Sequence, residues 1–512
     1  MSLPNILEEQ ANNNSLLGAV FTPLSVAVEV IEKFGLFEKW IEGATLFDPT
    51  AGEGNFLEAF VAIAVNRGLS IANLPLNRLY GVEMKAVFVE NFFLKMRNIY
   101  GISFPKENFI CQDFLLFKQK IQADYLIGNP PWLNFTELPD LYKPFIKPLF
   151  HQYGLVANAK ELLLGSARID FSALIVNKSI YENLKPGGQA IFFLPMSLFL
   201  NDGANRGFRA YHIQDIRFAV KEIYDYKNQN LFKSVETRYG LVRFERNVIQ
   251  HFPVPYFQQN TEKEWISLSA SPVFALDNPL SITQNNEEFV ALSLFEKICV
   301  PKSAQPRQGV NTCGANEVFV FDSLKKMSNN MVKLSNKFQE DIILPEKYVF
   351  PLIVTRNFSE KKPKAHKWVL LPYYATGKAL EWADIEAEIS LATYLQQHET
   401  RLKMRKGKML QSYLKRGYWW AMLGVGPYCF ENHKIVWESY GKKHFSPILL
   451  SGNWQGNQAM HAFMPMETQE LALETLCLMQ PEKVQTYLSS LQMEGTCNWA
   501  QPGKMKNLMT LS

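Results

Sequence analysis

The tetrapeptide Asn129-Pro130-Pro131-Trp132 directly follows an apolar stretch over residues 123–128. An exocyclic amino nitrogen conjugated into its ring is a poor nucleophile until its lone pair is freed. The Asn129 side-chain oxygen and the Pro130 carbonyl could accept its two hydrogens, and proline would fix the backbone that presents this carbonyl. Trp132 offers a flat face on which an extruded base could stack. This chemistry predicts transfer of a methyl group from a sulfonium to an amino nitrogen.

A glycine-containing turn follows an earlier apolar stretch, with the sequence Asp-Pro-Thr-Ala-Gly-Glu-Gly over residues 48–54. Gly52 and Gly54 would let the backbone approach a ligand closely where a helix begins, next to Asp48. On its own this segment is equally compatible with a tight strand-to-helix turn.

Two acidic residues stand at further strand ends. Glu83 could accept hydrogen bonds from both hydroxyls of a ribose. Asp113 could accept from an adenine amino group while Phe114 covers the ring face. Taken singly, Glu83 could be a solvated carboxylate and the segment at Asp113 a turn with a buried phenylalanine. The four strand ends together point to one nucleoside-containing cofactor.

The elements that must position these residues alternate along the first half of the chain. The residue patterns predict strands at 44–48, 78–83, 123–128 and 189–194, and helices at 55–66, 85–99 and 170–184, the last ending at Lys-Pro-Gly-Gly over 185–188. Such alternation implies a parallel sheet whose strand ends carry the ligand site. Two further strands, at 215–221 and 237–245, have no long helix between them, which predicts an antiparallel pair at one sheet edge.

The alternation stops near residue 247, where irregular segments containing Pro, Asn and Gln begin. We therefore expect two domains, residues 1–246 and residues 247–512, the second a mixed α+β domain. Basic residues interleaved with aromatic ones and free of acids fill residues 401–420. They include Arg401, Lys403, Arg405, Lys406 and Trp419. This run predicts contacts with nucleic-acid phosphates, although a solvated helix face would have the same composition.

Together these motifs resemble the gamma class of amino-methyltransferases and are similar to TaqI-type adenine DNA methyltransferases of restriction–modification systems. The resemblance is close over residues 20–246 and looser beyond. It implies an α/β fold, a Rossmann-like methyltransferase sheet with helices on both faces, followed by a C-terminal target-recognition domain. Two departures are Trp132, where the family more often has tyrosine, and Asp48, where it more often has glutamate.

The resemblance also implies ligands and roles. The cofactor would be S-adenosyl-L-methionine, and the substrate adenine N6 in double-stranded DNA. A separately encoded restriction endonuclease would be a further partner. Cofactor-binding residues would be Thr22, Asp48, Gly52, Gly54, Glu83, Asp113, Phe114 and Asn129. Catalytic residues would be Asn129, Pro130, Pro131, Trp132 and Phe232, with Phe232 as the aromatic that sandwiches a flipped base.

Composition limits the alternatives. The 512 residues carry a net charge of +4, six cysteines without a C-x-x-C pair, and no apolar run of membrane-spanning length. These features predict a cytoplasmic protein with no membrane segment and no metal site. Protein-glutamine, ribosomal-RNA and cytosine-N4 methyltransferases stay open, as does a DNA-binding module with an inactive methyltransferase fold. Cytosine-C5 methylation needs a cysteine beside a proline, and the chain has no Pro-Cys dipeptide.

Overall fold

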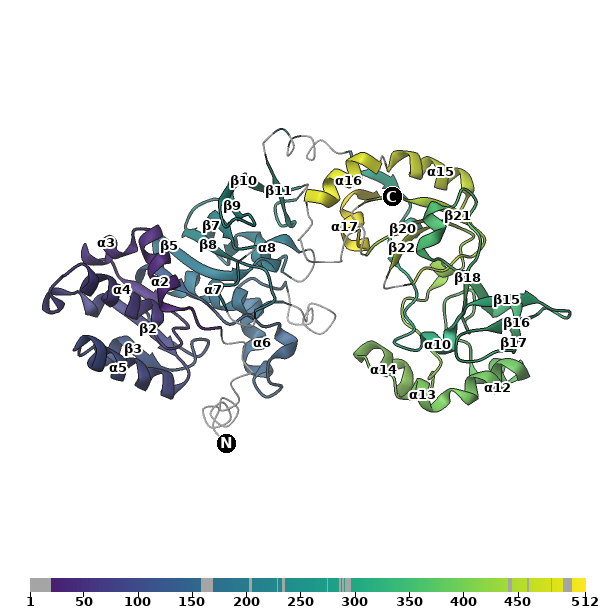
Figure 1. The fold of residues 1–512 in the computed structure, drawn as a ribbon, viewed down its shortest axis with the longest axis horizontal. Coiled ribbons are helices and arrows are strands. Elements are labelled where there is room, and N and C mark those ends of the chain that lie inside the picture. Colours follow the sequence, from purple (N-terminus) through teal and green to yellow (C-terminus); the bar gives the residue numbers. More distant parts are fainter. Residues whose placement is uncertain are drawn as a thin grey trace. The chain divides into compact units, whose positions relative to one another are not determined.

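The computed structural model divides the chain into two compact units, Met1–Ser293 and Leu294–Ser512 (Figure 1). The residues that it describes are 20–157, 169–201, 205–227, 229–232, 235–273, 275–284, 287, 290, 296–440, 444–457, 460–479, 481–490 and 500–512. Among these residues, helices long and apolar enough to cross a membrane are absent.

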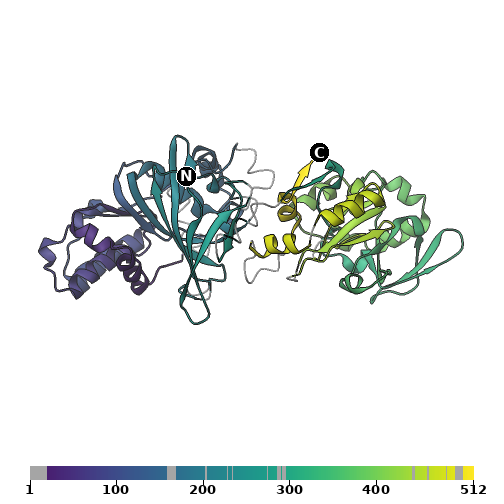
Figure 2. The same cartoon turned by 90° about the horizontal axis from the view of Figure 1, so that it is seen from above.

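The first unit contains an 11-stranded sheet in the order β11-β10-β9-β7-β8-β5-β4-β1-β2-β3, with β6 paired to β7. The strands β1, β2, β3, β4 and β5 pair in parallel, as the alternating sequence predicts. Figure 2 shows strands of this sheet side by side, in teal. The strands are β1 (Leu46–Asp48), β2 (Leu79–Glu83), β3 (Phe109–Cys111), β4 (Ala123–Gly128), β5 (Leu184–Pro195), β6 (His212–Ile213), β7 (Ile216–Asp225), β8 (Tyr239–Arg246), β9 (Val254–Gln259), β10 (Trp265–Pro272) and β11 (Leu280–Thr283).

Helices cover both faces of this sheet. One apolar cluster joins Leu46 of β1 and Phe193 of β5 to the helices that lie between residues 24 and 100, through residues such as Phe60 and Phe92. The neighbour of Leu46, Phe47, points to the other face and contacts the Phe114 ring at 6.1 Å, because successive strand residues alternate between faces. On that second face α7 packs against β5. The helices are α2 (Leu24–Lys33), α3 (Leu36–Ile41), α4 (Asn55–Asn66), α5 (Ala86–Tyr100), α6 (Lys143–Gln152), α7 (Phe171–Glu182) and α8 (Ser197–Leu200).

Local sequence signals explain where these helices begin and end. The helix predicted over residues 55–66 is α4, with the same bounds. The side chain of Asp170 caps α7 by accepting a hydrogen bond from Ser172 N. Gly101 ends α5 in the left-handed conformation that glycine adopts without strain. The Lys-Pro-Gly-Gly segment lies inside β5, which already begins at Leu184.

Two expectations about the edge of this sheet are corrected. The strands β7 and β8 are antiparallel, as predicted, but they lie inside the sheet, because β8 pairs with β5 and β7 pairs with β9. The sheet then continues through β10 and β11. The first compact unit consequently extends to Ser293, beyond the boundary expected at residue 247.

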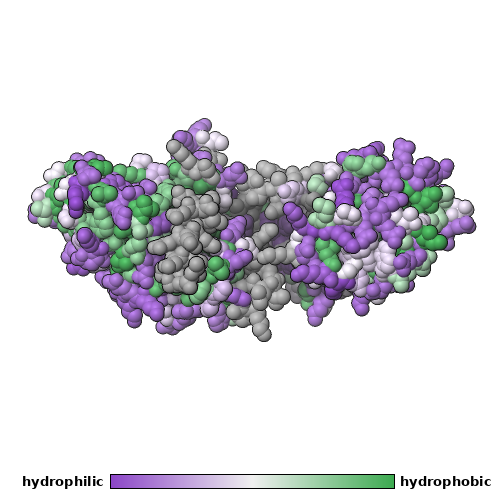
Figure 3. Space-filling model, turned by 90° about the horizontal axis from the view of Figure 1, so that it is seen from below, coloured by the Kyte–Doolittle hydropathy of each residue, from purple (hydrophilic) through white to green (hydrophobic). Residues whose placement is uncertain are grey.

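The second unit combines small sheets with helices around a separate apolar core. Its sheets have the orders β12-β23, β13-β22-β20-β21, β14-β19-β18 and β15-β16-β17. On the face that Figure 3 draws, hydrophilic side chains predominate over this unit, at the right. The strands are β12 (Ile298–Val300), β13 (Arg307–Gln308), β14 (Val320–Phe321), β15 (Ser323–Lys326), β16 (Met331–Ser335), β17 (Ile342–Pro345), β18 (Val349–Leu352), β19 (Lys367–Leu370), β20 (His433–Glu438), β21 (Ile448–Ser451), β22 (His461–Met466) and β23 (Met509–Leu511). The helices are α10 (Asn316–Phe319), α11 (Trp382–Glu386), α12 (Ile389–Gln397), α13 (Glu399–Lys403), α14 (Lys408–Lys415), α15 (Gln469–Leu478), α16 (Pro481–Ser490) and α17 (Pro502–Asn507).

Candidate active site

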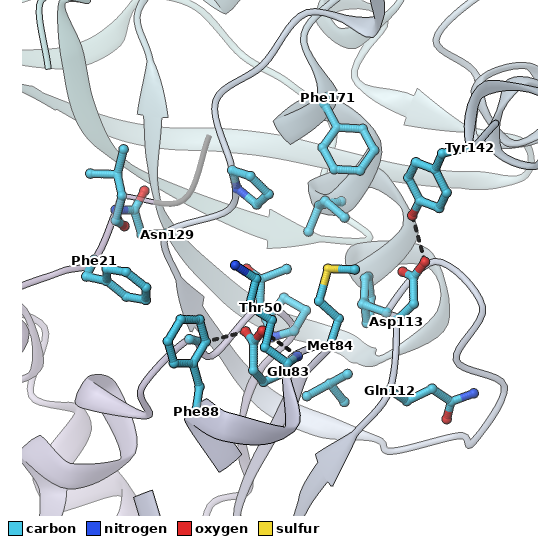
Figure 4. Close-up of a pocket in the computed structure, with 18 residues that line it drawn as sticks. Phe21, Thr50, Glu83, Met84, Phe88, Gln112, Asp113, Asn129, Tyr142 and Phe171 are labelled. Atoms are coloured by element: carbon cyan, nitrogen blue, oxygen red, sulfur yellow. Dashed lines mark hydrogen bonds between the residues drawn. The ribbon is translucent and has the colours of Figure 1, made fainter. Parts of the chain in front are cut away.

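A cavity lies at the carboxyl ends of β1, β2, β3 and β4, the edge at which an open α/β sheet binds ligands. It encloses about 870 Å³ of empty space, including the part open to solvent. Figure 4 shows Asn129 and Phe21 at one end, Glu83 between, and Asp113 with Tyr142 at the other end. The lining residues are Val20, Phe21, Pro49, Thr50, Gly52, Val82, Glu83, Met84, Lys85, Phe88, Gln112, Asp113, Phe114, Asn129, Pro131, Tyr142, Phe171 and Ile175.

The glycine turn brings the backbone to the floor of this cavity. Gly52 lines the cavity with φ +56°, and a Cβ there would lie 3.2 Å from the Phe21 ring. Gly54 faces the protein instead, because a Cβ on it would lie 2.3 Å from the Phe92 ring. Gly52 therefore leaves room for a ligand, and Gly54 allows α4 to pack against α5.

Asp48 anchors the same turn from beneath and does not line the cavity. It is 1% exposed, and its Oδ1 accepts a hydrogen bond from Thr50 N at 3.0 Å. Burial raises the pKa of Asp48 to about 8, and the negative charge of Glu83 acts in the same direction. Asp48 was predicted to bind the cofactor, and the structure places it beneath the turn whose residues Pro49, Thr50 and Gly52 line the cavity.

Glu83 presents a carboxylate to the middle of the cavity. Its Oε2 accepts a hydrogen bond from Gly52 N, and its Oε1 accepts one from Lys85 N, each at 2.9 Å. Each oxygen keeps a further lone pair, so the two carboxylate oxygens can still accept hydrogen bonds from two hydroxyls on a bound sugar. Burial raises the pKa of Glu83, whereas the two backbone hydrogen bonds oppose this shift.

Asp113 lies at the end of the cavity opposite Asn129. Its Oδ1 accepts from Leu115 N at 2.8 Å, and its Oδ2 accepts from the Tyr142 hydroxyl at 2.7 Å. Phe114 lines the cavity beside it and is 3% exposed. A carboxylate next to an aromatic ring suits a purine that carries an amino group.

Asn129 has one end of its amide fixed and the other end open. Its Nδ2 donates to the Val20 carbonyl at 3.0 Å and to Thr22 Oγ1 at 3.3 Å. The Val20 carbonyl can only accept, and this identifies Nδ2 as the nitrogen. Oδ1 is then a buried acceptor with no hydrogen-bond partner among the described residues. Thr22 itself is buried outside the cavity lining, so it holds Asn129 rather than contacting a ligand.

Trp132 and Phe232, which were predicted to sandwich a flipped base, contact each other inside an aromatic cluster. The Trp132 ring lies edge-on to Phe232 at 5.5 Å and stacks on Tyr239 at 5.3 Å. Phe232 is 1% exposed and also contacts Phe193 at 5.2 Å. A base can enter between Trp132 and Phe232 only if Phe232 leaves this contact. Residues 233–234, which belong to the predicted motif, lie outside the described residues.

Sequence reasoning missed part of the cavity lining. Met84 and Phe88 follow Glu83 closely, and their nearness to that strand end was a usable signal. Tyr142 lies between β4 and α7, and Phe171 is the first residue of α7. Neither is part of a recognisable motif, and only tertiary packing brings them to the cavity.

The predicted DNA-contact residues of the second unit divide into two groups. Arg405 is 7% exposed and donates hydrogen bonds to the carbonyls of Leu402, Thr312, Trp419 and Ala421 at 2.7–3.0 Å. Trp419 is 8% exposed and packs against other tryptophans in the core. Both predictions are corrected, because neither side chain is available to DNA in this structure.

The remaining predicted residues are exposed at the surface. Arg401 forms an ion pair with Glu317, and Lys403 forms one with Glu399. Lys406 is exposed just before Gly407, between α13 and α14. Exposed pairs of this kind contribute little to stability, so their cations can be shared with phosphates.

Comparison with known proteins gives relatives of one kind. The Type II methyltransferase M.HindII of Haemophilus influenzae is 25% identical over 303 residues, 57% of this chain and 49% of that protein. The Type II methyltransferase M.BstVI of Geobacillus stearothermophilus is 24% identical over 442 residues, 76% of this chain and 72% of that protein. The chain spans about half the length of M.HindII and of M.HincII. No protein-family model matches the chain.

The fold is similar to that of the Type IIL restriction-modification enzyme MmeI, solved in complex with DNA. The TM-score is 0.55 at 13% identity, and the match covers 98% of this chain and 66% of MmeI. The cavity fits S-adenosylmethionine, because the carboxylates of Asp113 and Glu83 both line it and can accept hydrogen bonds, and an adenine amino group and ribose hydroxyls can donate them. The chain thus has the fold of S-adenosylmethionine-dependent methyltransferases, its curated relatives are Type II methyltransferases, and S-adenosylmethionine is its cofactor.

Proposed function

We propose that the chain is a site-specific DNA methyltransferase that transfers the methyl group of S-adenosylmethionine to N6 of an adenine flipped out of duplex DNA. The observation that carries this proposal is the Oδ1 of Asn129, which is buried and has no hydrogen-bond partner in the part of the chain that the structure describes. A buried acceptor without a partner costs free energy, so its retention points to a donor that arrives with the substrate.

An exocyclic amino group supplies such a donor. The Asn129 oxygen and the Pro130 carbonyl accept its two hydrogens and turn its lone pair toward the methyl group. Asn129 is held for this task before substrate binds, because Val20 O and Thr22 Oγ1 fix its nitrogen. Preorganised acceptors of this kind stabilise the positive charge that develops on the attacking nitrogen.

The substrate class is supported by the relatives and by the second unit. The relatives are Type II methyltransferases, and the chain aligns with MmeI over both of its units. The second unit carries exposed basic residues that can neutralise phosphates, among them Lys361, Lys362 and Lys406. We assign it the role of reading the target sequence, within a restriction–modification system whose nuclease is encoded separately.

The direct test offers the purified chain three acceptors with S-adenosylmethionine labelled in its methyl group: duplex DNA, structured RNA and a protein extract. We expect label in duplex DNA, recovered after digestion as N6-methyladenine. Recovery of the label as N4-methylcytosine would support methyl transfer to an amino group but would overturn adenine as the target base. Label confined to RNA or protein would overturn the proposed function.

A further inference from the structure

The segment between β4 and α7 extends from residue 129 to residue 170 and contains α6. Its two ends are tied together, because Phe171 N donates to Leu133 O at 2.6 Å and Phe135 N donates to Ile169 O at 2.9 Å. Phe150 of α6 is fully buried, and its ring contacts Phe135 at 5.4 Å. This packing fixes α6 on the first unit.

The packing places one side chain of this segment, Tyr142, in the cofactor cavity. Tyr142 is 5% exposed, and its hydroxyl donates to Asp113 Oδ2 at 2.7 Å. Its ring lies edge-on to Phe171, a second lining residue, at 6.5 Å. Figure 4 shows this hydrogen bond at the end of the cavity away from Asn129.

We propose that Tyr142 is a positioning residue that orients the Asp113 carboxylate so that it accepts a hydrogen bond from the amino group of the cofactor's adenine. This inference rests on the proposed function and assigns a role to a segment that carries no motif. Leu115 N holds one carboxylate oxygen and the Tyr142 hydroxyl holds the other, so the carboxylate cannot rotate. An acceptor fixed in this way before binding loses less entropy when the purine arrives.

The same contact favours the ionised form of Asp113. Burial raises the pKa of Asp113, and the hydrogen bond from Tyr142 opposes this shift, as does the charge of Lys178 on α7, itself paired with Glu182. Loss of the Tyr142 hydroxyl therefore favours the protonated carboxyl, which is a poorer acceptor for an amino group.

The test is Tyr142→Phe, which removes the hydroxyl and keeps the ring. Calorimetry measures binding of S-adenosylhomocysteine and of S-inosylhomocysteine, which lacks the purine amino group. If Tyr142→Phe lets the Asp113 carboxylate turn away from the purine amino group, binding loses one hydrogen bond to a charged group, which weakens it about tenfold. We therefore expect that loss for the adenosine compound and much less for the inosine compound. The matched control is Tyr153→Phe. Tyr142 directly precedes α6 and Tyr153 directly follows it, and the Tyr153 hydroxyl donates to the Glu182 carboxylate outside this cavity.

Asp113→Asn completes a double-mutant cycle. If Tyr142 acts through Asp113, adding Tyr142→Phe to Asp113→Asn changes affinity by less than twofold. Equal weakening of both compounds, or full additivity in the cycle, would reduce Tyr142 to a packing residue. If the wild type binds S-adenosylhomocysteine and Tyr142→Phe has the same ratio of affinities for the two compounds as the wild type, this inference alone is overturned. A wild type that binds neither compound overturns the proposed function itself.

Discussion

Replacement of Glu83 by alanine tests two roles of one carboxylate, which accepts hydrogen bonds from the backbone and faces the ligand cavity. The side chain holds Gly52 N and Lys85 N at 2.9 Å, and it faces the middle of the cofactor cavity. Loss of the charge-assisted hydrogen bonds to a ribose should weaken S-adenosylmethionine binding by about 1–3 kcal/mol. Loss of the acceptor for two backbone N–H groups should also lower the free energy of unfolding, by about 1–2 kcal/mol, since water from the cavity can replace part of each bond.

Titration calorimetry measures the first effect and urea unfolding without cofactor measures the second. Glu53→Ala is the matched control, because Glu53 follows Gly52 in the turn that Glu83 contacts and does not line the cavity. It should leave cofactor affinity within twofold. If Glu83→Ala is folded and binds S-adenosylmethionine as tightly as the wild type does, the ribose assignment is wrong.

Three further predictions concern a buried acid, the basic run and the stacking ring. The pKa of Asp48 is raised to about 8, so the folded state binds this proton more tightly than the unfolded state. The unfolding free energy of the wild type should then fall as pH rises from about 4 to about 8 and level off above that, because in this range the unfolded state has released the proton and the folded state keeps it. The unfolding free energy of Asp48→Asn should fall less, and parallel urea-unfolding profiles of the two proteins from pH 6 to 9 would contradict this. Arg405→Ala should lower the free energy of unfolding by about 3 kcal/mol or more, because Arg405 donates to several buried carbonyls. Lys406→Ala should leave that free energy within about 0.5 kcal/mol and reduce the salt slope of DNA binding by about one. The reverse pattern would refute the assignment of Arg405 as buried and Lys406 as exposed. Trp132→Ala should weaken binding of a target duplex by about 1–3 kcal/mol, and a mispaired target base should recover part of this loss in a fluorescence titration; equal losses on both duplexes would exclude stacking.

The sequence predicted most of the parallel half of the sheet, because each strand and helix there carries its own periodicity. The helix over residues 55–66 and the strand over residues 123–128 have the expected bounds. The strands β9, β10 and β11 were not predicted, since they follow a change in sequence texture. Their membership of the sheet depends on the pairing of β9 with β7, a contact between distant residues.

In the site, too, the residues that belong to local motifs were predicted and those brought in by distant contacts were not. Motif residues at strand ends were predicted together, because parallel strands end at one edge, and Glu83, Asp113 and Asn129 all line the cavity. Tyr142 reaches the cavity through helix packing that no local pattern records. The basic run misled for a related reason: Arg405 satisfies four backbone carbonyls of its own unit, and composition does not distinguish such an arginine from one that contacts phosphate.

The central claim is that the open oxygen of Asn129 orients an amino group for methyl transfer. Single-turnover methylation of an oligonucleotide duplex that contains the target adenine measures this most directly, with Asn129→Ala beside Asn55→Ala. Asn55 is the matched control, because its Nδ2 also holds the 20–22 segment, by donating to Thr22 O at 2.8 Å, but it does not line the cavity. We predict that Asn129→Ala slows methyl transfer by about 10²-fold or more with nearly unchanged cofactor affinity, while Asn55→Ala has a rate close to that of the wild type. Methylation by Asn129→Ala at the wild-type rate would contradict the account.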